Sequence, residues 1–255
     1  SDATSAVSLV HSEEVASIDP GVRGLAITNG DNLEASGSVF RAIFNEFYSG
    51  GDVNFITSEQ IARVKEIAKQ RAASDQRLIQ LDPEMANLRD DEPVIGYYGR
   101  LVPEKSGRER AFSNENIRKM VEAGVQVIIA ANVQAHTQSM LKDLRDLQRQ
   151  VNDPEKRGRL IVLNGWGLPE QGTLLAATDV QVQDSDRGTE AAGFTESDAS
   201  VNGALQVAPT GLEGILQTQG IIVDRERPGI GNTLIPDSDK PDSYWKVYEW
   251  VIKQF

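Results

Sequence analysis

The sequence predicts an α/β fold in which helices cover both faces of a parallel β-sheet. Three observations lead to this prediction. Short apolar runs recur along the chain from residue 94 onwards, apolar positions at helical spacing lie between them, and the 10 prolines and 22 glycines fall mostly at the junctions. Strands that alternate with helices form βαβ units, so the predicted sheet is Rossmann-like.

The expected strands are short runs of β-branched and other apolar residues. From residue 94 onwards they are Val94–Tyr98, Val125–Ala130, Leu160–Leu163, Val180–Gln183, Leu205–Ala208 and Ile221–Val223. Nearer the start of the chain, Leu25–Thr28 is a further candidate strand, because the turn sequence Asn29-Gly30-Asp31 follows it.

Helices are expected between these strands, because apolar residues recur there three and four positions apart. Ser113 is placed to cap the first of these helices, and Asn202-Gly203 closes the last. The four segments are Ile117–Ala123, Met140–Val151, Leu174–Ala177 and Phe194–Val201.

Two more helices are expected outside this alternation. Thr57 and Gln60 form a capping box for a helix over residues 58–80, whereas residues 30–54 and 82–92 are typical of irregular connections. An apolar stripe at helical spacing predicts a C-terminal helix. The stripe consists of Tyr244, Val247, Tyr248, Val251 and Ile252.

The aromatic residues of this last helix have two interpretations. Trp245, Tyr248 or Trp250 packs against the surface of a partner, or the rings cover the chain's own core. The two interpretations are equally open at this point, although apolar helix faces in general more often cover a core than a partner.

Composition excludes several classes of protein. The chain has 255 residues, 39% of them hydrophobic, which is enough for one sizeable core. Its 26 basic and 38 acidic residues give a net charge of −12, which argues against a nucleic-acid surface. No apolar run is long enough to cross a membrane and no signal peptide is recognisable, so a cytoplasmic protein is expected, or a plastid protein in a plant-like source.

Metal binding is not indicated either. The chain has no cysteine, which removes thiolate ligands and disulfides. Its two histidines, His11 and His136, lie far apart in the sequence, which argues against a site built on histidine.

Candidate binding residues come after the strands, since parallel sheets bind ligands at the carboxyl ends of their strands. Arg100 and Lys105 follow the first strand and could neutralise a diphosphate. Trp166 follows the third and could stack on a base, and Glu190 follows the fourth and could bind sugar hydroxyls. Each has an ordinary alternative: the cations lie on a solvated loop, Trp166 packs in the core, and Glu190 is a surface acid.

Two further loops contain residues suited to phosphate. Ala192, Gly193, Phe194 and Thr195 run into a helix, whose free N-terminal amides favour an anion. Thr210 and Gly211 follow the fifth strand, although glycine there is equally typical of a plain turn.

Several of these segments resemble the glycogen and starch synthases. Val94–Gly107, VIGYYGRLVPEKSG, is similar to the strand and loop that read about SRL-x-x-QKG in that family. Thr189–Thr195, TEAAGFT, resembles FEPCGLT, while Asn202–Ala208 and Thr210-Gly211-Leu212 resemble YGTLPLV and TGGL. Ile27–Asp31, ITNGD, is similar to the LNGID that precedes the family's second domain.

The resemblance implies a fold and an activity. The chain would be the second, nucleotide-sugar-binding domain of a retaining GT-B glycosyltransferase that extends an α-1,4-glucan from ADP-glucose or UDP-glucose. Residues 93–255 would be this domain with its C-terminal helix, and residues 1–92 a connecting segment and helix of the same domain. The family's N-terminal domain, with its K-x-GG loop, has no counterpart here, so the chain would be inactive without that partner.

The resemblance also implies roles for the candidate residues. Arg100 and Lys105 would bind the diphosphate and stabilise the departing nucleotide, and Glu190 would contact the donor sugar. Gly193 and Thr195 would hold phosphate, Trp166 would lie beside the base, and no bound metal would be needed. The remaining candidates of the nucleotide site are Ala192, Phe194, Thr210 and Gly211.

Departures from the family pattern keep two alternatives open. Asp198 stands where related transferases have the second glutamate of E-x7-E, Ala192 replaces a cysteine, and Gly211 stands alone where the family has two glycines. A non-catalytic module that docks to a glucan or a protein would tolerate such changes. A different nucleotide-using enzyme such as an epimerase is disfavoured, because no G-x-G-x-x-G follows an early strand.

Overall fold

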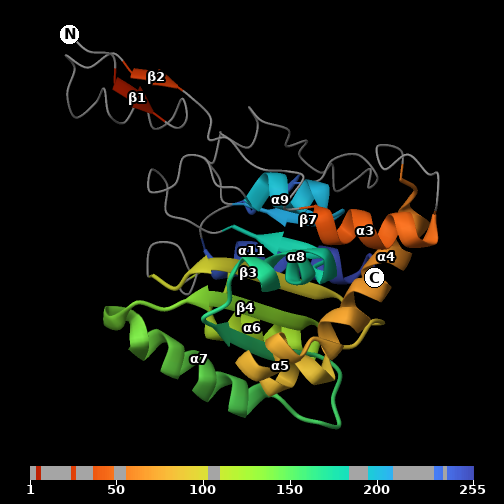
Figure 1. Cartoon of the computed structure of the whole chain (residues 1–255). Helices are drawn as coiled ribbons and strands as arrows, with labels where there is room; N and C mark the ends of the chain where they lie inside the picture. The colour runs from red at the N-terminus through yellow and green to blue at the C-terminus, as the bar shows by residue number, and fades with distance from the viewer. Residues whose placement is uncertain are drawn as a thin grey trace.

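The computed structural model describes residues 4–6, 24–26, 37–48, 56–102, 110–183, 195–208, 233–237 and 240–255. Its centre is a sheet of six parallel strands in the order β5-β4-β3-β6-β7-β8 (Figure 1). The strands are β3 (Val94–Arg100), β4 (Gln126–Asn132), β5 (Arg159–Asn164), β6 (Val180–Val182), β7 (Leu205–Val207) and β8 (Thr233–Leu234). The predicted Rossmann-like parallel sheet is therefore confirmed.

Helices cover both faces of this sheet (Figure 1). On one face lie α3 (Ser38–Phe47), α4 (Ser58–Ser74) and α8 (Leu168–Ala177), and on the other α6 (Asn114–Glu122), α7 (Gln138–Val151) and α11 (Pro241–Ile252). The shorter elements are α5 (Gln76–Leu81), η1 (Pro83–Asn87), η2 (Ala135–Thr137) and α9 (Thr195–Val201).

Successive side chains of β4 pack alternately into the cores on the two faces of the sheet. Val127 and Ile129 belong to the core under α6 and α11, whereas Ile128 and Ala130 belong to the core under α4 and α8. A strand buried on both sides has to be apolar at every position, which explains the unbroken run VIIAA.

The predicted helix starts are confirmed. The Thr57 N–H donates to Gln60 Oε1 at 2.9 Å and the Gln60 N–H donates to Thr57 Oγ1 at 3.2 Å, which is the expected capping box. The Ser113 hydroxyl caps α6 by accepting from the Asn116 N–H at 3.2 Å. The helix expected over 58–80 is two helices, because Asp75 leaves helical geometry and caps α5 through the Arg77 N–H.

Other expectations about the connections need correction. Residues 30–54 contain a helix, α3, whose residues Phe40, Ile43 and Phe44 are buried against α4 and α8. Residues 82–92 contain η1. The expected strand Ile221–Val223 lies outside the described residues, and the sixth strand of the described sheet is β8.

Near the start of the chain, the candidate strand at Leu25 is confirmed as β2 (Gly24–Ala26). It pairs in parallel with β1 (Thr4–Ala6), which the sequence patterns did not indicate. These two strands form a sheet of their own.

The C-terminal helix α11 packs mainly on the chain's own core. Tyr244, Val247, Tyr248 and Val251 are fully buried, so the suggestion that Tyr248 meets a partner is wrong. Trp245 and Trp250 are partly buried against the same core, and the Lys119 ammonium lies 5.5 Å from the centroid of the Trp245 ring.

Side chains form hydrogen bonds with the backbone groups of β5 that face away from the sheet, at its outer edge. Asp82 Oδ2 accepts from the Val162 N–H at 2.8 Å, from Gln148 Nε2 at 2.6 Å and from the Arg145 guanidinium at 2.9 Å. The neighbouring Leu160 carbonyl accepts from Gln148 Nε2 at 3.0 Å. Edge strands with free backbone groups are templates for aggregation, and these side chains occupy that edge.

Replacement of Asp82 by Ala should destabilise the fold, because it removes the acceptor of the Val162 N–H and one of the two acceptors of the buried Gln148 Nε2. We expect a loss of about 2–4 kcal/mol in the free energy of unfolding, measured by urea denaturation. Asp143→Ala, which removes an exposed carboxylate from α7, should stay within about 0.5 kcal/mol of the parent chain. Equal losses in the two variants would contradict the role given to Asp82.

Candidate functional site

The order of the sheet reverses between β3 and β6, and this reversal marks the place to look for a ligand. The chain runs outward from β3 to β5 and then returns to the other side of β3. In open parallel sheets the crevice at such a point, outside the carboxyl ends of the strands, is the usual binding site. The carboxyl ends point towards the left-hand side of Figure 1.

Arg100, the last residue of β3, is exposed at this carboxyl edge of the sheet. Its backbone is held firmly: Arg100 pairs with Asn132 of β4, its carbonyl accepts from the Tyr97 hydroxyl at 2.6 Å, and the next residue, Leu101, is fully buried. Among the described residues the guanidinium has no ion pair or hydrogen bond. A cation on a fixed backbone without a protein partner is ready for an anionic ligand.

Trp166 lies at the same edge of the sheet, after β5. Gly165 has a φ of 82° and Gly167 donates its N–H to Glu170 Oε2 at 2.9 Å, so the turn that carries the indole is fixed on both sides. The half-buried ring meets Tyr98 edge to face, with centroids 6.2 Å apart. The indole Nε1 is buried, and no acceptor among the described residues receives its hydrogen. The packing interpretation of Trp166 is therefore partly correct, and one polar atom remains available.

Gln183, directly after β6, is a residue that the sequence analysis did not single out as a candidate. It is 4% exposed, and neither atom of its carboxamide has a hydrogen-bond partner within the described part of the chain. The signal that could have identified it is the run VQVQ at Val180–Gln183, since a polar residue at every second position of a strand buried on both faces is unusual.

The structure describes only part of the predicted site. Arg100 and Trp166 lie at the same edge of the sheet, and Thr195 is the first residue of α9. The other predicted residues lie outside the described residues. These are Lys105, Glu190, Ala192, Gly193, Phe194, Thr210 and Gly211.

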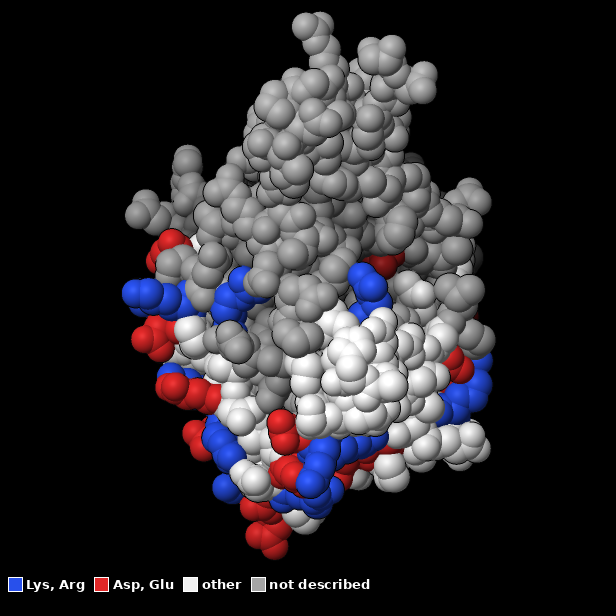
Figure 2. All heavy atoms as spheres, turned by 90° about the vertical axis from the view of Figure 1, so that its left-hand side faces the viewer, with Lys and Arg blue, Asp and Glu red and all other residues white. Residues whose placement is uncertain are grey.

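Surface charge on this side is mixed. Figure 2 faces the side to which the carboxyl ends point, and its described part shows basic and acidic side chains interspersed. Because the described part of this face has no broad positive field, an anion would depend on individual cations such as Arg100.

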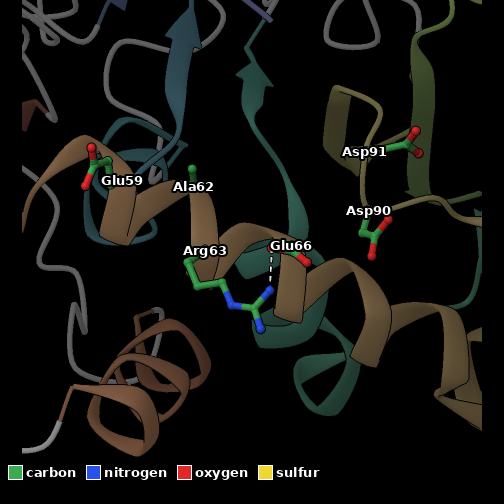
Figure 3. A pocket seen from close by; sticks show the side chains of 6 residues that line it. All are labelled: Glu59, Ala62, Arg63, Glu66, Asp90 and Asp91. Carbon is green, nitrogen blue, oxygen red and sulfur yellow. Dashed lines mark ion pairs between the residues drawn. The ribbon is translucent and has the colours of Figure 1, made fainter.

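An acidic depression lies elsewhere, between α4 and the turn before β3 (Figure 3). It has a volume of about 560 Å³ and is lined by Glu59, Ala62, Arg63, Glu66, Asp90 and Asp91. Three of its four acids already have partners: Glu66 pairs with Arg63 at 2.6 Å, Asp91 with Arg157 at 2.7 Å, and Asp90 accepts from Gln70 at 2.5 Å. We therefore do not regard it as the functional site.

A second cluster of charged groups is buried at the amino edge of the sheet. The Lys69 ammonium lies 2.7 Å from Asp179 Oδ2 and donates to the Glu92 carbonyl at 2.8 Å, and the Lys65 amine donates to the Thr178 carbonyl. Burial lowers the pKa of Lys65 from 10.5 to about 7, against the raising effect of Asp179 and with a further lowering by Lys69. The cluster ties α4 to the sheet at the edge opposite the crevice.

Two other kinds of site have no support in the described residues. They contain no group of three or more His, Cys, Asp or Glu side chains placed to hold a metal ion. No helix in the same part of the chain combines the length and the apolar character that crossing a bilayer requires.

Comparison with known proteins finds similar structures but no similar sequences. No family model and no curated protein sequence matches the chain. Crystal structures of HepE from Anabaena have a similar fold: the complex with UDP-glucose at a TM-score of 0.59 and 14% identity, the complex with UDP at 0.60 and 14%, and the complex with UDP and glucose at 0.60 and 16%. The alignments cover 98–99% of this chain and 53–54% of HepE, so the chain spans about half the length of HepE.

The lowered pKa of Lys65 predicts a stability that depends on pH. An unfolded lysine keeps its proton up to about pH 10.5, whereas folded Lys65 releases it near pH 7. The penalty on folding is therefore complete below pH 7 and declines as the pH rises towards 10.5. Lys65→Met should raise the free energy of unfolding by about 1–3 kcal/mol at pH 7, and this gain should shrink by pH 10.

Urea denaturation of both chains at the two pH values measures this effect. Lys142→Met, which changes an exposed lysine of α7, is the control and should show no such dependence on pH. A gain for Lys65→Met that is the same at pH 7 and pH 10 would rule out titration of Lys65 as its cause.

Proposed function

We propose that this chain is the nucleotide-sugar-binding half of a GT-B glycosyltransferase, with UDP-glucose or ADP-glucose as donor. The observation that carries the proposal is the carboxyl edge of the sheet, where the exposed guanidinium of Arg100 and the indole of Trp166 lie at the ends of β3 and β5. The crystal structures of HepE, which share the fold, contain UDP-glucose, UDP, or UDP and glucose, and so support this class of ligand.

The proposed glycosyl transfer requires stabilisation of the negative charge on the departing nucleotide. Transfer breaks the bond between the anomeric carbon of the sugar and the diphosphate, so negative charge grows on the departing nucleotide. Arg100 would stabilise that charge through a bidentate contact, with Lys105 as a second cation. These cations would replace a metal ion, Glu190 would bind the sugar, and Gly193 and Thr195 would hold phosphate.

The finer activity follows from the resemblance to glycogen and starch synthases. We propose retaining transfer of glucose to the end of an α-1,4-glucan, with the acceptor held by an N-terminal glycosyltransferase domain. Because transfer requires donor and acceptor to be held together, the donor half by itself would be inactive. The similarity to only about half of HepE is consistent with this proposal.

A second candidate is a non-catalytic module that docks to a glucan or a protein. One observation favours it: Asp198, which stands where related transferases have their second glutamate, is 6% exposed on α9. Aspartate is one methylene shorter than glutamate, so its carboxylate would reach less far towards a donor sugar. Nucleotide binding separates the two candidates.

Calorimetric titration with UDP, ADP, UDP-glucose and ADP-glucose tests the proposal. The parent chain should bind one pair of ligands, and the pair identifies the base. Arg100→Ala should weaken that binding by about 10–100-fold, because a hydrogen bond between charged groups contributes about 1.5–3 kcal/mol. Arg118→Ala, which changes an exposed arginine of α6, is the matched control and should bind like the parent.

Two results would count against the proposal. A folded chain that binds none of the four ligands would favour the docking module. Binding that survives unchanged in Arg100→Ala and in Lys105→Ala would place the nucleotide elsewhere than the crevice at β3 and β6.

A further inference from the structure

Gln183 lacks a hydrogen-bond partner on both atoms of its carboxamide within the described residues, whereas the buried Gln206 lacks one on Nε2 and accepts on Oε1 from the Thr233 hydroxyl at 3.4 Å. Gln126 donates from Nε2 to the Arg89 carbonyl at 2.8 Å and accepts on Oε1 from the Arg89 N–H at 2.6 Å, and Gln148 Nε2 donates to Asp82 and to Leu160. Gln183 is as well buried, yet both its amide atoms are without a partner in the described part of the chain. A buried polar group without a partner costs about 1–3 kcal/mol, so its presence needs an explanation.

The position of Gln183 in the sheet explains why its buried amide has no partner among the described residues. Gly96 of β3 pairs with Gln181 of β6, so two residues further on Tyr98 and Gln183 lie at the same level of the sheet. The Gln183 N–H donates to the Val207 carbonyl at 2.9 Å, which fixes its backbone beside β7. The residue thus comes at the carboxyl end of β6, next to the end of β3 where the strand order reverses.

The side chain of Gln183 also lies on a defined face of the sheet. Val180 and Val182 belong to the core under α6 and α11, and strand alternation puts Gln183 on the opposite face. Tyr98 and Trp166 pack on that same opposite face, in the core under α4 and α8. The indole N–H of Trp166 and the carboxamide of Gln183, both buried and without a partner in the part of the chain that the structure describes, therefore share one face at one edge of the sheet.

The order of these residues across the sheet matches the order of groups in a nucleotide sugar. Trp166 follows β5, Arg100 ends β3 two strands away, and Gln183 follows β6, the next strand on the far side of β3. With strands about 4.8 Å apart, Trp166 and Gln183 flank Arg100 at about 10 Å and 5 Å along the edge. A base at Trp166 and a diphosphate at Arg100 would bring the sugar to Gln183.

We infer that Gln183 binds hydroxyl groups of the donor sugar and so distinguishes a nucleotide sugar from the free nucleotide. This inference rests on the proposed function. A carboxamide offers two donor hydrogens and an acceptor oxygen, and a sugar hydroxyl both donates and accepts. A diphosphate only accepts, so it would leave the Gln183 oxygen unsatisfied. A site built to bond a hydroxyl discriminates strongly against a ligand that lacks it.

Gln183→Met tests the inference, because methionine has a similar length and no polar amide. The variant should bind UDP-glucose about 5–20-fold more weakly and UDP within about twofold of the parent chain; if the base is adenine, the same holds for ADP-glucose and ADP. The ligand-free variant should also melt about 2–4 °C higher, because an unsatisfied buried group has been removed.

Gln181→Met is the matched control, since Gln181 is a buried glutamine on the same strand and the same face, two residues further from the edge. It should leave the ratio of the UDP-glucose and UDP affinities unchanged. The ligand pair is again ADP-glucose and ADP if the base is adenine.

The outcomes separate this inference from the proposed function. If Gln183→Met weakens UDP as much as UDP-glucose, or weakens neither, Gln183 does not bind the sugar, while the proposed function stands. A lower melting temperature, or a variant that does not fold, would show a structural role for the amide and would also overturn the inference. If the folded parent chain binds none of the four ligands, the proposed function fails and the inference fails with it.

Discussion

The carboxylate of Asp179 joins the two strands between which the sheet reverses its order. Its Oδ2 accepts from the Val94 N–H at 2.7 Å and lies 2.7 Å from the Lys69 ammonium, while the Asp179 N–H donates to the Val94 carbonyl at 3.0 Å. Since Val94 begins β3 and Asp179 immediately precedes β6, this contact aligns the amino ends of both strands. The ends of β3 and β6 at the opposite edge, and with them Arg100 and Gln183, are positioned as a consequence.

The two edges of the sheet differ in how their polar groups are satisfied. At the amino edge, Glu92 accepts from the Arg157 guanidinium at 3.1 Å and from the Gly158 N–H at 3.0 Å, in addition to the contacts of Asp179. At the carboxyl edge, the guanidinium of Arg100, the indole N–H of Trp166 and the amide of Gln183 have no partner among the described residues. Within the described residues, ion pairs and hydrogen bonds join the elements at the amino edge, where Arg159 Nε still lacks an acceptor, whereas several polar groups at the carboxyl edge have no protein partner.

Most of the fold was predictable because its signals are local. Apolar runs identified β3 to β7 with every strand end placed within two residues, and Thr57 and Ser113 marked the starts of α4 and α6. The helix α3 was missed because Gly37 offers no capping side chain and the surrounding stretch is rich in glycine and polar residues. The break at Asp75 was missed because an aspartate inside a helical pattern reveals its capping role only when its contacts are known.

The sequence by itself determined the alternation of strands and helices, the parallel sheet, and the placing of Arg100 and Trp166 after their strands. These follow from periodicity and from chain order, which are properties of neighbouring residues. Only the tertiary structure decided that Lys65 and Lys69 are buried, that Tyr248 covers the chain's own core, and that the Gln183 amide has no partner among the described residues. Whether a polar group is satisfied depends on residues far away in the chain, such as the 110 positions between Lys69 and Asp179, and no local pattern contains that information.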